Sequence, residues 1–429
     1  MSAPAGRAAR SPWRWIPTLY VGQGLPYVVV MTVSVILYKN LGLSNTEIAL
    51  LTSWLYLPWV IKPLWSPLVD LFGTKRGWIV GLQFTVGAAL AMVALALPAP
   101  KAVQLSLAVF WLMAFASATH DIAADGYYML ALSQQRQAAF VGVRSTFYRL
   151  AMIAGQGAVV VAAGWLAERT GQVVLAWQIV FAALALLFAL FAAWHLVVLP
   201  RPAADAPARS GRGIAADTWR SFAAFFGRPD IVLVLAFLLS FRLGEAQALK
   251  LISPFLLDAR GEGGLGMSTT QVGIVYGTIG VIALTIGGIV GGVAISRQGL
   301  RFWLWPMLLA VHVPNLAYVG LAALQPESAA LIAAAIAVEQ FGYGFGFAAY
   351  LLFMIMVADG PHKTAHYALC TGFMALGMML PGMASGWIQA RLGYPGFFAW
   401  VCLCTLPSMA VALRLRIDPA FGRRGEDPV

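Results

Sequence analysis

Charged residues are scarce in this chain of 429 residues. Asp, Glu, Lys and Arg make up 10% of the sequence, whereas about 25% is usual in a soluble globular protein. Hydrophobic residues make up 60%, and the mean hydropathy is +0.79. This shortage of charge excludes a soluble enzyme with a solvated surface and a disordered chain. It predicts a protein that crosses a membrane several times.

Cysteine is also scarce, and its placement is not that of a metal site or a disulfide framework. Cys370, Cys402 and Cys404 lie inside apolar runs, so we expect small buried side chains. The sequence shows no phosphate-binding loop and no nucleophile beside a base. It therefore predicts no catalytic residue, no metal and no cofactor, and a protein that is not an enzyme.

Long apolar runs take the place of the missing charge. A helix needs about 20 apolar residues to cross a bilayer core of about 30 Å. Twelve runs meet this requirement, so we predict an all-α polytopic membrane protein with 12 transmembrane helices. The runs cover residues 15–38, 47–66, 77–97, 102–130, 138–165, 174–199, 230–257, 270–295, 301–323, 328–358, 364–388 and 394–415.

The longest polar stretch separates the first six runs from the last six. We expect an N-terminal six-helix half at 1–199, a cytoplasmic linker at 200–229, and a C-terminal six-helix half with a short cytoplasmic tail at 230–429. The linker is rich in Ala, Arg, Pro and Gly, which is typical of a flexible segment. One short amphipathic stretch lies near residues 217–226.

Acidic residues are fewer than basic ones, 17 against 28, and the basic ones are unevenly placed. With the N-terminus in the cytoplasm, 18 Lys and Arg residues fall on the cytoplasmic side and 5 on the other. Because basic loops stay in the cytoplasm, both termini are predicted to lie there. The same bias accounts for the net charge of +11 without a nucleic-acid partner.

Two motifs occur once in each half. LGLSNTEI at 41–48 matches LGMSTTQV at 265–272, and each is a capping box in which a Ser caps the next helix. Further on, Gly164-Trp165 with Gly171 and Trp177 matches Gly386-Trp387 with Gly393 and Trp400. The offsets, 222 to 224 residues, agree at both ends of a six-helix unit. They indicate a duplication, which is the plan of major facilitator transporters.

Charged residues near the cytoplasmic end of the second run suggest a conformational latch. Asp70 precedes a Gly and the basic pair Lys75-Arg76, which resembles the cytoplasmic signature of that superfamily. We interpret this segment as contacts that form in one state and break in another. Lys62 completes the predicted charge network. The alternatives are ordinary positive-inside topology for Lys75 and Arg76, and a Lys62 side chain that reaches the interface.

The fourth run carries two acids that are candidates for proton coupling. An ionised side chain in hydrocarbon costs several kcal/mol unless it is paired or wetted. Asp121 and Asp125 lie four residues apart, so they share one helix face and suit reversible proton binding. The alternative is that each acid neutralises an arginine, and Arg144 and Arg149 on the fifth run are the expected partners.

The seventh run carries Arg242, Glu245 and Lys250. Arg242 and Glu245 lie three residues apart and can pair within their helix. Since the first helix of each half lines the central cavity in this plan, we favour a substrate-binding role, with Arg242 as a fork for an anionic group. A self-neutralised pair is the alternative. Lys250 is expected to extend toward the membrane surface.

Three further polar residues lie within apolar runs. Glu339, midway along the tenth run, is a third candidate for proton coupling, and its alternative role is a carboxyl hydrogen-bonded to a neighbouring helix. Gln23 and Tyr27 on the first run are candidates for substrate binding, because amides and aromatic rings suit sugar or peptide ligands.

Several segments in both halves resemble the AmpG muropeptide permeases, which belong to the peptide, acetyl-coenzyme A and drug transporter branch of the major facilitator superfamily. His120 stands where that family has Gln. The similar segments are KPLWSPLVD at 62–70, KRGW at 75–78, SATHDIAAD at 117–125, YRLAM at 148–152, FFGR at 225–228 and RLGE at 242–245.

The resemblance implies proton-linked import of anhydro-muropeptides or related amino-sugar fragments across a bacterial inner membrane. It implies that Lys62, Asp121, Asp125 and Arg149 are important. Many family members have two more C-terminal helices than the twelve predicted here. An alternative hypothesis is that the cargo is a siderophore or another bulky anionic metabolite. A third hypothesis is that the protein is a membrane-embedded sensor on a transporter scaffold. We expect a monomer whose partners are the substrate, protons and the bilayer.

Overall fold

The computed structural model describes residues 11–206, 214–419 and 421–422. All regular elements in this part of the chain are helices, which confirms the predicted all-α class. We call the first six spans the N-terminal half and the last six the C-terminal half.

The N-terminal half is built from nine α-helices and three shorter helical turns. Its first span is interrupted by a π-helical turn that follows Pro26, a residue that cannot donate the usual backbone hydrogen bond. In chain order the elements are η1 (Pro12–Arg14), α1 (Ile16–Val28), η2 (Val29–Val33), α2 (Ser34–Asn40), α3 (Asn45–Trp54), α4 (Leu57–Leu71), α5 (Lys75–Ala96), α6 (Ala102–Ala131), α7 (Gln134–Ile153), η3 (Ala154–Val159), α8 (Val160–Thr170) and α9 (Val173–Val198).

The linker helix and the C-terminal half follow. The seventh span is broken between α11 and α12, and the eighth contains a long π-helical stretch. The elements are α10 (Ile214–Phe226), α11 (Ile231–Ser240), α12 (Leu243–Leu257), η4 (Arg260–Glu262), α13 (Thr269–Val272), η5 (Gly273–Gly280), α14 (Val281–Gln298), α15 (Leu300–His312), η6 (Val313–Asn315), α16 (Leu316–Leu324), α17 (Ala329–Ala358), α18 (Lys363–Leu403) and α19 (Leu406–Ala412).

The helices account for the twelve predicted spans. Ten segments of the described chain are long and apolar enough to cross a membrane. The predicted second span forms α3 and α4, which a turn after Trp54 separates. The segment Lys363–Ala412 contains the last two spans, because the backbone turns at Gly393, where φ is 64°. The protein is therefore a multi-pass membrane protein with twelve helical spans.

The duplicated motifs share local features in both halves. Both capping boxes form, at Ser44 and at Ser268. Gly171 and Gly393 both have a positive φ, of 67° and 64°, which favours glycine, but their ψ angles differ, at 9° and 175°.

The structure extends the second motif by one arginine. Arg169 lies 4.2 Å from the ring centroid of Trp165, and Arg391 lies 4.0 Å from that of Trp387. The repeat is therefore Gly-Trp followed by Arg and Gly at equal spacing.

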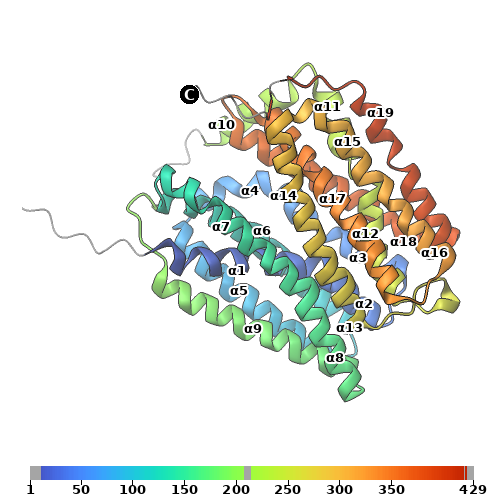
Figure 1. Ribbon diagram of the computed structural model, residues 1–429. Coiled ribbons are helices and arrows are strands. Elements are labelled where there is room, and N and C mark those ends of the chain that lie inside the picture. The colour runs from blue at the N-terminus through green and yellow to red at the C-terminus, as the bar shows by residue number, and fades with distance from the viewer. Residues whose placement is uncertain (1–10, 207–213, 420, 423–429) are drawn as a thin grey trace, which may run out of the picture.

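The two halves meet most closely at one end of the molecule. Figure 1 shows α2, α8 and α13 gathered at that end, which we call the distal end, with α10 at the opposite, proximal end. Across the halves, α3 and α4 pack against α18, while α8 and η3 pack against α13 and η5. From there α7 and α14 diverge toward the proximal end (Figure 1).

Within the C-terminal half, α14 and α17 approach each other through glycines. A Cβ at Gly287 would lie 2.9 Å from the backbone N of Phe345 and 3.0 Å from the carbonyl carbon of Phe341. Since small residues allow such approach between membrane helices, these glycines set the spacing of the pair.

We predict that Gly287→Ala destabilises the protein by about 1–3 kcal/mol, because the added methyl group would force α14 away from α17. The measurement is the apparent thermal unfolding midpoint in detergent. Gly292→Ala is the matched control on the same helix, since a Cβ there meets no atom within 4 Å. Equal midpoints for the two variants would show that this contact does not limit stability.

Candidate substrate and proton site

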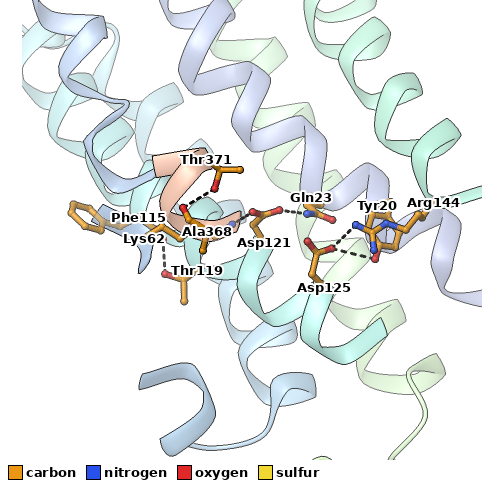
Figure 2. A network of polar contacts seen from close by, with 10 residues as sticks. All are labelled: Tyr20, Gln23, Lys62, Phe115, Thr119, Asp121, Asp125, Arg144, Ala368 and Thr371. Atoms are coloured by element: carbon orange, nitrogen blue, oxygen red, sulfur yellow. Dashed lines mark hydrogen bonds and ion pairs between the residues drawn. The ribbon is translucent and has the colours of Figure 1, made fainter. Parts of the chain in front are cut away.

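Asp121 joins three helices of the N-terminal half. Helix α6 directs its carboxylate toward Gln23 on α1 and Lys62 on α4, and Figure 2 shows it between those two side chains. The Gln23 Nε2 and the Lys62 Nζ both donate to it. The side chains of Lys62 and Asp121 are 24% and 26% exposed, so this ion pair is partly accessible to solvent.

Asp125 has a different cation. Arg144 on α7 donates from Nη2 to its Oδ1 at 2.9 Å, and the Tyr20 hydroxyl donates to the same oxygen at 3.4 Å (Figure 2). The Arg144 guanidinium also lies 4.8 Å from the ring centroid of Tyr20 and 5.1 Å from that of Tyr128. The two acids of α6 therefore share a face but belong to separate ion pairs.

Arg149, the other expected partner of these acids, pairs with neither. It is half-buried and forms no ion pair with any carboxylate of the described chain. Its guanidinium instead reaches toward α14 of the opposite half, where a Cβ at Gly288 would lie 3.3 Å from Nη2. Glycine at that position leaves room for the guanidinium.

Arg242 lies at the break between α11 and α12 and pairs with Glu245, as their spacing allows. The contact uses two hydrogen bonds, Nη2 to Oε1 at 2.6 Å and Nε to Oε2 at 3.1 Å. Nη2 also donates to the Tyr343 hydroxyl at 2.7 Å, and the guanidinium lies 5.2 Å from the ring centroid of Phe347. In this conformation Arg242 is buried, and its charge is neutralised by Glu245.

The expectation that Lys250 extends toward the membrane surface is wrong. The residue is 1% exposed, and its Nζ donates to Thr52 Oγ1 at 3.0 Å. It also lies 5.1 Å from the ring centroid of Tyr56. The amine therefore joins α12 to the α3–α4 span across the halves, without a carboxylate partner among the described residues.

Glu339 on α17 is 4% exposed and hydrogen-bonded on both sides. The Tyr318 hydroxyl of α16 and the Gln340 amide each donate to its Oε2 at 2.9 Å. This arrangement is the hydrogen bond to a neighbouring helix that the sequence left open as the alternative. A proton-coupling role for Glu339 stays a prediction.

Tyr27 on α1 packs edge-to-face against Trp59 on α4, with centroids 5.3 Å apart. The pair joins the first two spans on the side where Asp121 meets Gln23 and Lys62. The Gln23 Oε1, by contrast, is a buried acceptor with no hydrogen-bond partner in the described part of the chain.

The predicted latch residues lie at the start of α5. The backbone N–H groups of Lys75 and Arg76 donate to the carboxylate of Asp205, at 2.7 and 3.0 Å. The Arg76 Nη2 and Nε also donate to carbonyl oxygens at the end of α9. The side chain of Asp70 lies outside the described residues. The acid seen to cap α5 is therefore Asp205, and the latch stays a prediction.

A buried polar chain inside the N-terminal half was missed by the sequence reasoning. Gln83 on α5 lies 3.1 Å from His120 Nε2 and 2.7 Å from His195 Nδ1, and Thr18 Oγ1 lies 2.9 Å from His195 Nε2. The chain joins four helices directly behind Asp121. Gln83 and His195 are polar residues in otherwise apolar runs, and that signal could have identified them.

Residues 19–363 match the Major Facilitator Superfamily. The chain belongs to this superfamily. The transporter is similar to the anhydromuropeptide permease of Escherichia coli (strain K12), with 26% identity over 364 residues that cover 83% of this chain and 70% of the relative. It is also similar to the putative transporter AmpG 4 of Rickettsia conorii, with 26% identity over 92% of this chain and 94% of the relative.

Solved structures of similar fold include the D-xylose-proton symporter, with a TM-score of 0.65 and 15% identity over 95% of this chain and 98% of that one. This likeness shows the fold, and the relatives show a transporter of the AmpG-like group rather than an enzyme. The resemblance seen in the sequence motifs is confirmed.

We predict that Lys62 and Asp121 are energetically coupled. Lys62→Met and Asp121→Asn should each leave one partner unsatisfied inside the bundle, and the double variant should lose less stability than the sum of the two. A coupling of about 0.5–3 kcal/mol is expected for residues in contact, measured as a double-mutant cycle of unfolding midpoints.

The control cycle is Lys363→Met with Asp359→Asn, a pair at 3.7 Å whose side chains are 62% and 74% exposed. Exposed pairs contribute little, so we expect almost no coupling there. Equal coupling in both cycles would contradict a special role for the inner pair.

Proposed function

We propose that this protein is a proton-coupled importer of anhydro-muropeptides, or of related cell-wall amino-sugar fragments, in the inner membrane of a bacterium. The observation that carries the proposal is the Asp121 cluster. It places a partly exposed carboxylate inside a transmembrane helix, with Lys62 and Gln23 as its only described partners. The cargo class is supported by similarity to the permease whose name states it.

Protonation of Asp121 would change the contacts between two helices. The ionised carboxylate holds Lys62, and therefore α4, against α6. A protonated carboxyl group no longer attracts the ammonium group, so the two helices are released from each other. Because α4 also packs against α18 of the opposite half, this change reaches the interface between the halves. An acid that couples two states in this way lets the proton gradient drive uptake.

Arg149 is the best candidate for binding an anionic group of the cargo. A muropeptide carries carboxylates on its peptide, and a guanidinium can bind a carboxylate through two parallel hydrogen bonds. Arg149 has no carboxylate partner of its own in the described chain, whereas Arg242 is already bound to Glu245. The unpartnered Gln23 Oε1 can accept a hydrogen bond from a sugar hydroxyl or amide, and Tyr27 with Trp59 offers aromatic faces to a sugar ring.

The organisation of the chain forms part of the proposal. We assign 1–199 and 230–429 as the two transport halves and 200–229 as a cytoplasmic linker. The excess of Lys and Arg on one side supports cytoplasmic termini. The proximal end then faces the cytoplasm, and the distal end faces outward.

The test is uptake of a labelled anhydro-disaccharide peptide into vesicles of checked orientation, with and without an inward proton gradient. We expect gradient-driven accumulation by the parent protein. Asp121→Asn should abolish accumulation against a gradient while the protein remains folded and inserted, because an amide does not bind and release a proton as a carboxylate does. Proton-driven accumulation that survived in Asp121→Asn would remove this residue from coupling. If the folded parent protein accumulates no labelled peptide, the proposed cargo class is wrong. A siderophore would then be tested as the cargo.

Arg149→Gln tests the anion site. Hydrogen bonds to charged groups contribute about 1.5–3 kcal/mol, so we expect an affinity loss of about ten- to a hundredfold for the acidic cargo. A cargo analogue whose peptide carboxylates are converted to amides is the matched control, and its affinity should be the same in parent and variant. If both ligands lose affinity equally, Arg149 does not bind the carboxylate.

A further inference from the structure

The last span ends beside the start of the ninth span. Helix α14 runs to the proximal end of the molecule (Figure 1), and α15 begins there with Leu300. After α19 the chain continues through residues 413–419 and 421–422, which we call the tail. The tail returns to the start of α15, because the Leu300 N–H donates to the Phe421 carbonyl oxygen at 2.9 Å. Ile417 of the tail is 9% exposed, so this segment is packed against the bundle.

A cavity of about 640 Å³, which we call the tail cavity, lies between α15 and the tail. Its polar wall contains two cations, Arg301 and Arg416, and one acid, Asp418, which has an interaction of its own within the chain. The rest of its wall is apolar and includes Leu304, Trp305 and Leu413. The tail cavity therefore combines an excess of positive charge with an apolar side.

The two cations of the tail cavity have no anion. Other arginines of the bundle bind acids, as Arg144 and Arg242 do. Arg301 and Arg416 are exposed and form no ion pair or hydrogen bond with the part of the chain that the structure describes. Two like charges that line one cavity repel each other, so an anion held between them is attracted by both. A phosphate group suits this position, because guanidinium groups bind phosphate through paired hydrogen bonds.

The apolar side of the tail cavity continues into surface that faces lipid. Leu413 is 73% exposed, and Phe302, the third residue of α15, is 58% exposed. Trp305 lies one turn further into the span, and tryptophan is enriched where a membrane helix meets the headgroups. Arg301 and Arg416, just outside this level, therefore lie at the depth of the lipid phosphates, with the apolar side toward the acyl chains.

We infer that the tail cavity binds one anionic phospholipid, whose phosphate lies between Arg301 and Arg416. The first part of its acyl chains packs along Leu413 and Trp305. A soluble phosphate would use the cations and leave the apolar side empty, whereas a phospholipid uses both. The bound lipid joins the ninth span to the tail of the twelfth. The proposed topology assigns this site to the cytoplasmic leaflet, where anionic headgroups attract basic pockets between helices. The site does not depend on the cargo or on proton coupling.

The test is binding of phosphatidylglycerol to the delipidated full chain in detergent, followed by native mass spectrometry, with phosphatidylcholine for comparison. We expect the parent to bind one phosphatidylglycerol more tightly than phosphatidylcholine. Since a basic residue near anionic headgroups contributes about fivefold in affinity, Arg301→Gln and Arg416→Gln should each weaken phosphatidylglycerol binding by about that factor. Equal affinity of the parent for the two lipids, or unchanged affinity in both variants, would overturn the site.

Arg414→Gln is the matched control. Arg414 is an exposed arginine of the same tail, and its replacement removes the same charge, but it does not line the tail cavity. At an ionic strength of about 0.15 M, charges are screened over about 8 Å, so the affinity loss should be clearly smaller than in Arg416→Gln. Equal losses in these two variants would show a general surface attraction and overturn the cavity as the site. Unchanged unfolding midpoints without lipid would show that the variants are folded.

Two further measurements separate a lipid from a soluble anion. Leu413→Ser should weaken phosphatidylglycerol binding, because it removes apolar contact with the acyl chains and leaves both arginines in place. Glycerol phosphate, which has the headgroup without the chains, should not displace the lipid at equal concentration. Displacement by glycerol phosphate, together with unchanged binding in Leu413→Ser, would show a site for a soluble anion and overturn the lipid. Failure of muropeptide uptake in the parent would leave all of these measurements unaffected.

Discussion

The cost of placing a charge inside a membrane governs the arrangement of this transporter. An unpaired ion in hydrocarbon costs several kcal/mol, so pairing favours the insertion of buried charges, and both acids of α6 find their partners on other helices. Asp121 takes Lys62 from α4, and Asp125 takes Arg144 from α7. The charge pairs therefore act as ties between spans. A proton that removes one charge of a pair releases a tie, which gives the bundle a physical means of linking proton binding to movement.

Periodicity and composition were enough to predict the spans, because a membrane helix is specified by the length of its apolar run. The spacing of Asp121 and Asp125 likewise predicted their common face. The three-residue spacing of Arg242 and Glu245 allowed the pairing that the structure shows, which was the alternative to the favoured substrate-binding role. Residue spacing cannot show which helices become neighbours. For that reason the sequence did not reveal that Arg149 lacks an acid, that Lys250 reaches Thr52, or that Gln83 bridges two histidines.

Backbone irregularity was harder to predict than span position. The π-helical turns in spans one, five and eight and the break between α11 and α12 do not interrupt the apolar pattern. Yet one of these departures carries a predicted site residue, because Arg242 occupies the break in the seventh span. Glycine gave a partial signal. The sequence identifies Gly393 as a repeat position, and the structure shows that its backbone, with a positive φ of 64°, separates the last two spans.

The second span connects the distal end of the bundle with the Asp121 cluster. Its first segment, α3, begins with Asn45, which contacts Asp258 of the opposite half, and its second segment, α4, carries Lys62, which contacts Asp121. The turn between the segments lies where Lys250 of the opposite half meets Thr52 and Tyr56. A change at Asp121 that moves α4 therefore reaches the distal end through this turn, in addition to the packing of α4 against α18. Because a buried ammonium group with a hydroxyl and an aromatic ring as its described partners holds the turn, Lys250 is placed to decide whether the two segments move together.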